Sequence, residues 1–492
     1  MAQSNVVPLR RPTEPPPHEP DLRLVADRVK VYPRSVNGPV RRFKWVVLWV
    51  CLSIYYLLPW LRWGRGAGRP DQAFLLDLAH ERLYILGWEF WPQEVYFLAG
   101  VMVSAAVALF LVTSLIGRVW CGYACPQTVW TDLFMWVERR IEGDRNARMK
   151  RDAQALSWDK AWRKLAKHGI WLGVAFWTGG AWIMYFVDAP TVTAEFWTGR
   201  ASIEVYFFTG LFAATTYLLA GWAREQVCTY MCPWPRFQAA MLDEQTFTVT
   251  YQTWRGEPRG KKHQDETWDG RGDCIDCKAC VHVCPTGIDI RDGQQLECIN
   301  CGLCVDACNE VMTKLDRPNW LINWDNLARQ AAKSAGQKNV PLRLIRPRTM
   351  VYLSLLAIGA TVMAGVFFSR ATIALGIQRD RAPLFVRLAD GGIRNAYTIK
   401  VTNKTPQDEA MDIQLVGLDG AQLIIAESGD KPAERLDLTA PPDTETAYRV
   451  LVHGPGAVTG SLPVTFILHD RRTGETVQTP SAFLGPGATD RR

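Results

Sequence analysis

The sequence predicts a multi-pass α-helical membrane protein with five transmembrane helices, an inserted cysteine-rich segment and a C-terminal β-sandwich domain. Three observations support this fold class. Hydrophobic residues make up 48% of the 492 residues, with 21 tryptophans, and they are bunched into long runs. A central stretch of the chain holds eight of the 13 cysteines. The last roughly 110 residues alternate apolar and polar side chains, as strands do.

Five apolar runs are long enough to cross a bilayer as helices. They cover residues 45–61, 95–117, 170–187, 205–222 and 350–368. The shortest run would measure about 25 Å as a helix, which is just enough to span the hydrocarbon core. Between the first two runs, residues 62–94 are predicted to form a mixed polar and aromatic loop.

The distribution of Lys and Arg predicts the orientation, because cytoplasmic loops retain positive charge. Residues 118–168 are rich in both residue types, whereas residues 188–204 carry only Arg200. The N-terminus and the cysteine-rich segment are therefore predicted to be cytoplasmic, with the C-terminal domain on the opposite side. A reducing compartment also agrees with metal ligation by the cysteines rather than with disulfides.

Changes in composition set the predicted domain limits. We predict a disordered cytoplasmic tail over 1–40, four transmembrane helices over 41–225, a cytoplasmic cysteine-rich segment over 226–348, a fifth transmembrane helix over 349–369 and a β domain over 375–492. The β domain contains about seven alternating stretches, such as residues 397–402 and 464–468, separated by turn signals such as Asp419-Gly420. This pattern is typical of an immunoglobulin-like sandwich.

The spacing C-x2-C-x2-C-x3-C occurs twice between Cys274 and Cys308. Thiolates that converge from such a tight run bind [4Fe–4S] clusters, and the fourth cysteine of each run crosses to the other cluster. The pattern predicts a bacterial ferredoxin-like segment over about residues 265–315. We assign the first cluster to Cys274, Cys277, Cys280 and Cys308, and the second to Cys284, Cys298, Cys301 and Cys304. The alternative is a pair of zinc knuckles, although zinc sites usually pair two C-x2-C units.

A second motif, C-x-Y-x-C-P, also occurs twice, each time directly after an apolar run. Its cysteines are Cys121 and Cys125 in the first copy, and Cys228 and Cys232 in the second. Two crossings separate the copies, so both face the side of the predicted clusters. Positions i and i+4 of a helix are too far apart for an easy disulfide, and proline keeps the preceding cysteine out of the helix.

Four thiolates from these two motifs would make a soft metal site, suited to Cu(I), zinc or another iron–sulfur centre. The alternative is that small cysteines simply pack where two helical hairpins meet. The formal net charge of +7 does not predict nucleic-acid binding, because the basic residues flank apolar runs, where lipid headgroups explain them better.

Together these features resemble the FixG/CcoG family, also called RdxA, of cytochrome c oxidase accessory proteins. The C-x3-C-P pairs are also similar to those of the NapH and NosR families, but residues 376–381 and 390–398 and the outer β domain select FixG/CcoG. The resemblance implies a bacterial inner-membrane protein with a periplasmic C-terminal domain. It also implies reduction of Cu(II) to Cu(I) during assembly of the cbb3-type oxidase. The implied partners are membrane lipid, a cytoplasmic electron donor, copper-handling proteins and oxidase assembly components.

We therefore predict a cupric reductase in which two [4Fe–4S] clusters pass electrons to copper near the C-x3-C-P cysteines. One alternative is an electron-transfer subunit for another membrane redox system, such as quinol oxidation. The other is a non-enzymatic copper-binding or scaffold assembly factor. A bound quinone would favour the first alternative, and stoichiometric copper binding without turnover would favour the second.

Overall fold

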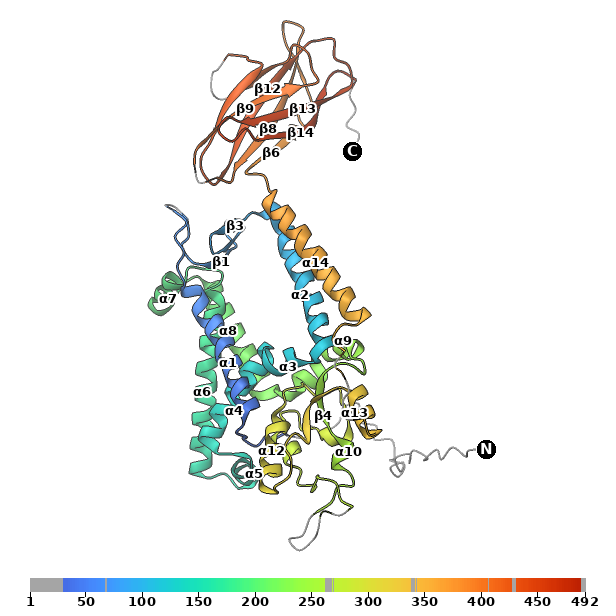
Figure 1. The fold of residues 1–492 in the computed structure, drawn as a ribbon. Coiled ribbons are helices and arrows are strands. Elements are labelled where there is room, and N and C mark those ends of the chain that lie inside the picture. Colours follow the sequence, from blue (N-terminus) through green and yellow to red (C-terminus); the bar gives the residue numbers. More distant parts are fainter. Residues whose placement is uncertain are drawn as a thin grey trace, which may run out of the picture. The chain divides into compact units, whose positions relative to one another are not determined.

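The computed structural model describes residues 30–66, 69–261, 268, 270–337, 341, 343–405, 407–426 and 431–487. Most of the predicted N-terminal tail therefore lies outside the described residues. The chain divides into two compact units, of which the first comprises Met1–Trp63 with Pro70–Leu356, and the second Gly64–Arg69 with Ala357–Arg492 (Figure 1).

Among the described residues, four helices are long and apolar enough to cross a membrane. They are Pro39–Trp60 (α1, Pro39–Leu57, and η1, Leu58–Trp60), Pro92–Ile116 (η2, Pro92–Glu94, and α2, Val95–Ile116), Ile203–Ala223 (α8, Ile203–Thr216, and the π-helix η3, Tyr217–Ala223) and Pro347–Phe368 (α14). These helices match four of the five predicted spans.

The predicted third span, residues 170–187, is not among these four helices. It falls in α6, Trp158–Ile183, whose first turns are charged and carry Asp159, Lys160, Arg163 and Lys164. The apolar part of α6 is short because the helix ends before residue 187. By length and composition, four of the predicted spans are therefore confirmed as candidate membrane helices, and the third predicted span stays a prediction.

Residues 62–94 do not form the predicted loop throughout. They contain a three-stranded antiparallel sheet of β1, Phe74–Asp77, β2, Arg82–Ile85, and β3, Trp88–Phe90. Leu75 and Tyr84 face each other across the first two strands and are both buried. The sequence prediction was wrong because the three strands are very short, so their alternation is hard to distinguish from an aromatic loop.

The rest of the first unit is a set of shorter elements, and all of its cysteines except Cys51 lie in these elements or in the loops between them. They are α3 (Val119–Tyr123), α4 (Pro126–Glu142), α5 (Arg145–Ala153), α7 (Ala189–Thr198), η4 (Val227–Met231), α9 (Trp234–Met241), β4 (Thr248–Tyr251), α10 (Thr253–Gly256), α11 (Ala279–Val283), η5 (Ile290–Asp292), α12 (Leu303–Lys314), β5 (Ile322–Asp325) and α13 (Leu327–Ser334). Strands β4 and β5 pair antiparallel and bracket the cysteine-rich stretch.

Buried ion pairs hold α4 against its neighbours. Glu138 in α4 pairs with Arg148 at 2.8 Å and with Arg224 at 3.0 Å, and Asp132 pairs with Arg41 of α1 at 2.7 Å. Burial alone would raise the pKa of Glu138, but Arg224, Arg148 and Lys167 together lower it to about 2. Some basic residues that suggested the orientation are therefore also part of the core.

The C-terminal unit consists of two antiparallel sheets. One contains β6 (Ile373–Arg379), β7 (Val386–Arg387), β8 (Ile393–Asn403), β10 (Gln422–Ile425) and β12 (Thr444–Gly454), and the other contains β9 (Glu409–Val416), β11 (Arg435–Ala440), β13 (Ser461–Asp470) and β14 (Thr476–Leu484). The described residues of this unit thus hold nine strands rather than about seven.

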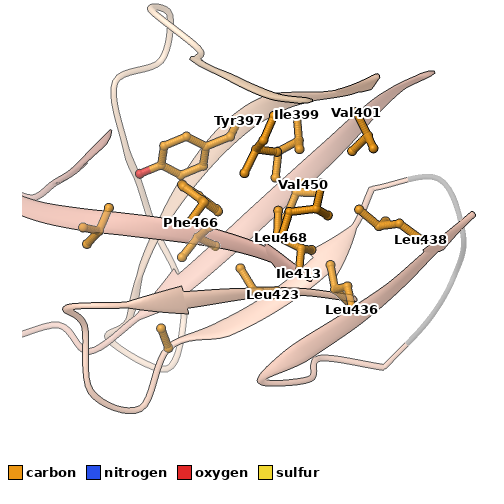
Figure 2. Packing of buried hydrophobic residues seen from close by; sticks show 14 of the residues in the cluster. Tyr397, Ile399, Val401, Ile413, Leu423, Leu436, Leu438, Val450, Phe466 and Leu468 are labelled. Atoms are coloured by element: carbon orange, nitrogen blue, oxygen red, sulfur yellow. The ribbon is translucent and has the colours of Figure 1, made fainter. Parts of the chain in front are cut away.

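Both sheets of this unit contribute to one apolar core. Tyr397 and Ile399 point inward from β8, while Ile413 and Phe466 point inward from β9 and β13 (Figure 2). The Tyr397 hydroxyl donates a hydrogen bond to the Ala482 carbonyl at 2.9 Å, which links the two sheets. No cysteine contributes to this core, because all 13 cysteines of the chain lie at or before Cys308.

Candidate metal centre

Three cysteines of the first run and the last cysteine of the second run line one cavity of the first unit: Cys274, Cys277, Cys280 and Cys308. The first two lie in a loop in which Asp276 (φ 52°) and Lys278 (φ 55°) adopt the left-handed conformation, so the loop curls tightly. The other two come from helices α11 and α12. This is the set that the sequence assigns to the first cluster.

Cys284, Cys298, Cys301 and Cys304 line a second cavity. The structure thus brings Cys284 to the second run, and Cys308 to the first, as the crossing pattern requires. Cys304 and Cys308 lie one turn apart on α12 and serve different cavities. Asn309 follows Cys308, where a proline is usual in such runs, and α12 continues through it to Lys314.

Burial raises the pKa of Cys280, Cys298 and Cys308 to about 12. For Cys308, the thiols of Cys280 and Cys274 add to the shift. Such thiols stay protonated on their own, whereas a bound metal replaces the proton and stabilises the thiolate.

The donor set fits a [4Fe–4S] cluster in each cavity, because each has at least four thiols within a largely apolar wall, with Cys280 lining both. The clusters would supply one-electron transfer. In the described part of the chain, no group of three or more His, Cys, Asp or Glu side chains is arranged to hold a single metal ion.

The cysteines of the two C-x3-C-P motifs lie in short helices or directly next to helix ends. Cys121 is in α3, and Cys125 is extended (φ −60°, ψ 130°) directly before α4. Cys228 is in the π-helix η4, and Cys232 is also extended (φ −80°, ψ 124°). The prolines thus start new segments after Cys125 and Cys232, as the sequence predicts.

These four thiols lie close enough to influence one another. Burial raises the pKa of Cys121 to about 11 and that of Cys228 to about 12, and the other thiols add to the shift at Cys228. The Cys121 thiol donates a hydrogen bond to Gln238 Oε1 at 3.1 Å, and Gln238 is fully buried. The structure therefore brings both C-x3-C-P motifs together.

The first C-x3-C-P motif packs directly on the loop of the second cavity. The Tyr123 hydroxyl donates to the Cys301 carbonyl at 3.0 Å. A Cβ atom placed on Gly122 would meet the Ile299 carbonyl oxygen at 2.6 Å, so only glycine permits this approach. The second motif does not repeat this contact, because Tyr230 is 74% exposed.

Two polar residues that the sequence analysis did not single out join these parts. Asn300 accepts a hydrogen bond from the Val249 amide at 2.6 Å and donates one to the Ile116 carbonyl at 3.0 Å. Asp306 in α12 accepts a hydrogen bond from the Arg41 amide at 2.7 Å and so caps the first turn of α1. Neither is part of a cysteine motif, so spacing gave no signal for them.

A ferredoxin-like arrangement of eight cysteines in a unit with membrane-length helices defines a membrane-associated iron–sulfur electron-transfer protein. Family models agree with the geometry. A 4Fe-4S dicluster domain matches residues 223–327, a 4Fe-4S binding domain matches residues 98–143, and the IG-like fold at the C-terminus of FixG matches residues 363–486.

The chain belongs to the FixG/RdxA family. It is 46% identical to "Nitrogen fixation protein FixG" of Rhizobium meliloti over 462 residues, which cover 88% of each chain. It is 47% identical to "Protein RdxA" of Cereibacter sphaeroides, covering 87% of this chain and 93% of the relative. "Protein RdxB" of the same organism is 45% identical, covering 94% of this chain and 98% of the relative.

Proposed function

We propose that this protein reduces Cu(II) to Cu(I) for the assembly of a cbb3-type cytochrome c oxidase. The observation that carries the proposal is the direct packing of the C-x3-C-P thiols on the loop of the second cavity. Cys121 and Cys228 share one hydrophobic cluster with Cys301 and Cys304. A redox centre at the second cavity would therefore have a short route to a metal ion at Cys121.

The chemistry of the thiols suits this reaction. One electron converts Cu(II) to Cu(I), and soft thiolate ligands favour the Cu(I) product. Because no three of these side chains are arranged for a single ion in the described residues, copper binding requires rotation of the thiol side chains. Binding also requires loss of the thiol protons, because burial raises the pKa of Cys121 and Cys228.

We infer the finer topology from the charge pattern. In this proposal α6 serves as a fifth span, the tail and the cysteine-rich segment are cytoplasmic, and the two sheets form a periplasmic immunoglobulin-like sandwich in the bacterial inner membrane. The domain limits stay as the sequence predicts. The partners are a cytoplasmic electron donor, copper-handling proteins and oxidase assembly components.

The test is anaerobic Cu(II) reduction by detergent-purified protein that has first been reduced, with a Cu(I)-specific chelator as readout. The proposal predicts Cu(I) formation over repeated cycles by the natural protein and none by Cys277→Ala, whose first cavity lacks one ligand. Copper binding without reduction would instead favour the scaffold alternative. If the protein neither bound nor reduced copper, the remaining alternative would be that it transfers electrons to another membrane redox system.

A further inference from the structure

A separate cavity of about 330 Å³ lies beside the second cluster site. Its wall includes Cys298, which also lines the second cysteine cavity. Small-molecule sites in proteins measure about 300–1,000 Å³. The cavity is therefore large enough for a ligand that would touch a cysteine of the redox centre.

Arg118 supplies the charge of this cavity. Its side chain is 5% exposed, and one terminal nitrogen donates to the Leu296 carbonyl. The guanidinium also interacts with the Cys121 thiol, but its buried Nε has no hydrogen-bond partner among the described residues. An unpaired buried donor of a charged group costs free energy, so this guanidinium favours a ligand that offers an acceptor oxygen.

The remaining wall restricts the ligand further. No carboxylate lines the cavity within the described part of the chain, so it suits an anionic or carbonyl oxygen better than a bare cupric ion. Leu242, Val249 and Ile290 give it apolar sides that fit a planar ring. Gln294 and Leu296 are exposed, so this part of the wall faces solvent.

We propose that this cavity binds a planar two-electron carrier with a ring carbonyl oxygen, of the quinone or flavin class, and that its dihydro form is the electron donor. The inference rests on the proposed function and deepens it, because it names the class of donor that the copper reaction needs. Quinone binding supports it together with Cu(II) reduction, and quinone binding without Cu(II) reduction would favour quinol oxidation for another redox system. The dihydro carrier loses two protons to solvent and two electrons to two one-electron acceptors, which the two [4Fe–4S] clusters supply. Arg118 stabilises the negative oxygen that remains after the first proton leaves.

The test uses Ala239→Phe, which fills the cavity from α9 without changing a polar group. Ala240→Phe is the matched control, because Ala240 is the exposed next residue and does not line the cavity. Binding of menadione and of flavin mononucleotide is measured by quenching of tryptophan fluorescence. Anaerobic bleaching of the cluster absorbance by each reduced carrier is measured in the absence of copper, with dithionite as a control for intact clusters.

We expect Ala239→Phe to weaken carrier binding about tenfold or more, and to slow bleaching by the reduced carrier, while dithionite still bleaches the clusters. Ala240→Phe should behave like the natural protein, and Arg118→Gln should also bind more weakly. An effect confined to menadione assigns the site to a quinone, and one confined to flavin mononucleotide assigns it to a flavin. Equal binding by Ala239→Phe and the natural protein, or binding of neither carrier, would overturn the inference.

This result is separable from the copper reaction. Cluster bleaching by the carrier is followed without copper, whereas Cu(II) reduction is followed with dithionite-reduced protein and no carrier. If the carrier fails to bleach the clusters while Cu(II) reduction succeeds, only the proposed donor site is overturned.

Discussion

The two sets of cysteines in the first unit are built differently. The eight cysteines between Cys274 and Cys308 line two cavities, and Cys280 contributes to the wall of both. The four C-x3-C-P cysteines lie in short helices or next to helix ends, and only Cys121 among them is buried. Exposure does not separate the two sets, because Cys277 is exposed and Cys284, Cys298 and Cys304 are only partly buried. Position does separate them: the C-x3-C-P cysteines line neither of these two cavities. In the proposed function the first set stores electrons and the second exchanges copper.

The largest expected effect separates the two sets by iron content. Cys304→Ala removes one ligand of the second cavity, so the iron bound per chain should fall to about half. Cys125→Ala should retain all of the iron, because Cys125 lines neither cysteine cavity. Iron analysis with electron paramagnetic resonance checks both variants. Equal loss of iron in Cys125→Ala would show that the C-x3-C-P cysteines hold a cluster of their own.

A smaller effect, on stability, is expected at Asn300, which hydrogen-bonds to both Val249 and Ile116. Asn300→Ala leaves the buried Val249 amide and the Ile116 carbonyl without this partner. The residue also has φ 57°, which asparagine tolerates better than alanine. We expect a loss of about 2–4 kcal/mol in the free energy of unfolding.

Denaturant unfolding of the detergent-solubilised protein measures this loss. The matched control is Asn319→Ala, because the Asn319 side chain accepts only an exposed hydrogen bond from Thr313. A control variant as unstable as Asn300→Ala would show that Asn300 has no special part in joining the sets.

The smallest effect is expected at Gly122, where the first C-x3-C-P motif approaches the loop of the second cavity. Gly122→Ala places a methyl group 2.6 Å from the Ile299 carbonyl oxygen and 3.0 Å from Cys301 Cα. Overpacking of this kind costs about 1–3 kcal/mol. Gly169→Ala in α6 is the control, since nothing lies within 4 Å of its added methyl group. Thermal unfolding should show a lower midpoint for Gly122→Ala alone, and equal midpoints would argue against a tight contact.

Residue spacing predicted the features that are local in sequence. The grouping of Cys284 with the second run and Cys308 with the first follows from the motif alone, and hydropathy found all four membrane-length helices. The turns before Pro126 and Pro233 followed from the restricted backbone before proline.

The features that sequence reasoning missed depend on contacts between distant segments. Asn300 and Arg118 carry no motif, and their roles arise only when the end of α2 meets the cysteine loop. The third span stays a prediction for a different reason, because charged residues extend α6 toward its N-terminus while its apolar stretch ends early. The two copies of C-x-Y-x-C-P also differ in their contacts, which the repeated spacing does not show. Tyr123 contacts the cysteine loop, whereas Tyr230 is exposed.

The most direct test of the account is Cu(II) reduction by the variant Cys121→Ala/Cys125→Ala/Cys228→Ala/Cys232→Ala. The protein is reduced anaerobically, its clusters are quantified by electron paramagnetic resonance, and Cu(I) formation is followed with a chelator. The account predicts that both clusters remain and that Cu(II) reduction is lost. Reduction at the natural rate without these four cysteines would contradict the assignment of copper to the C-x3-C-P thiols.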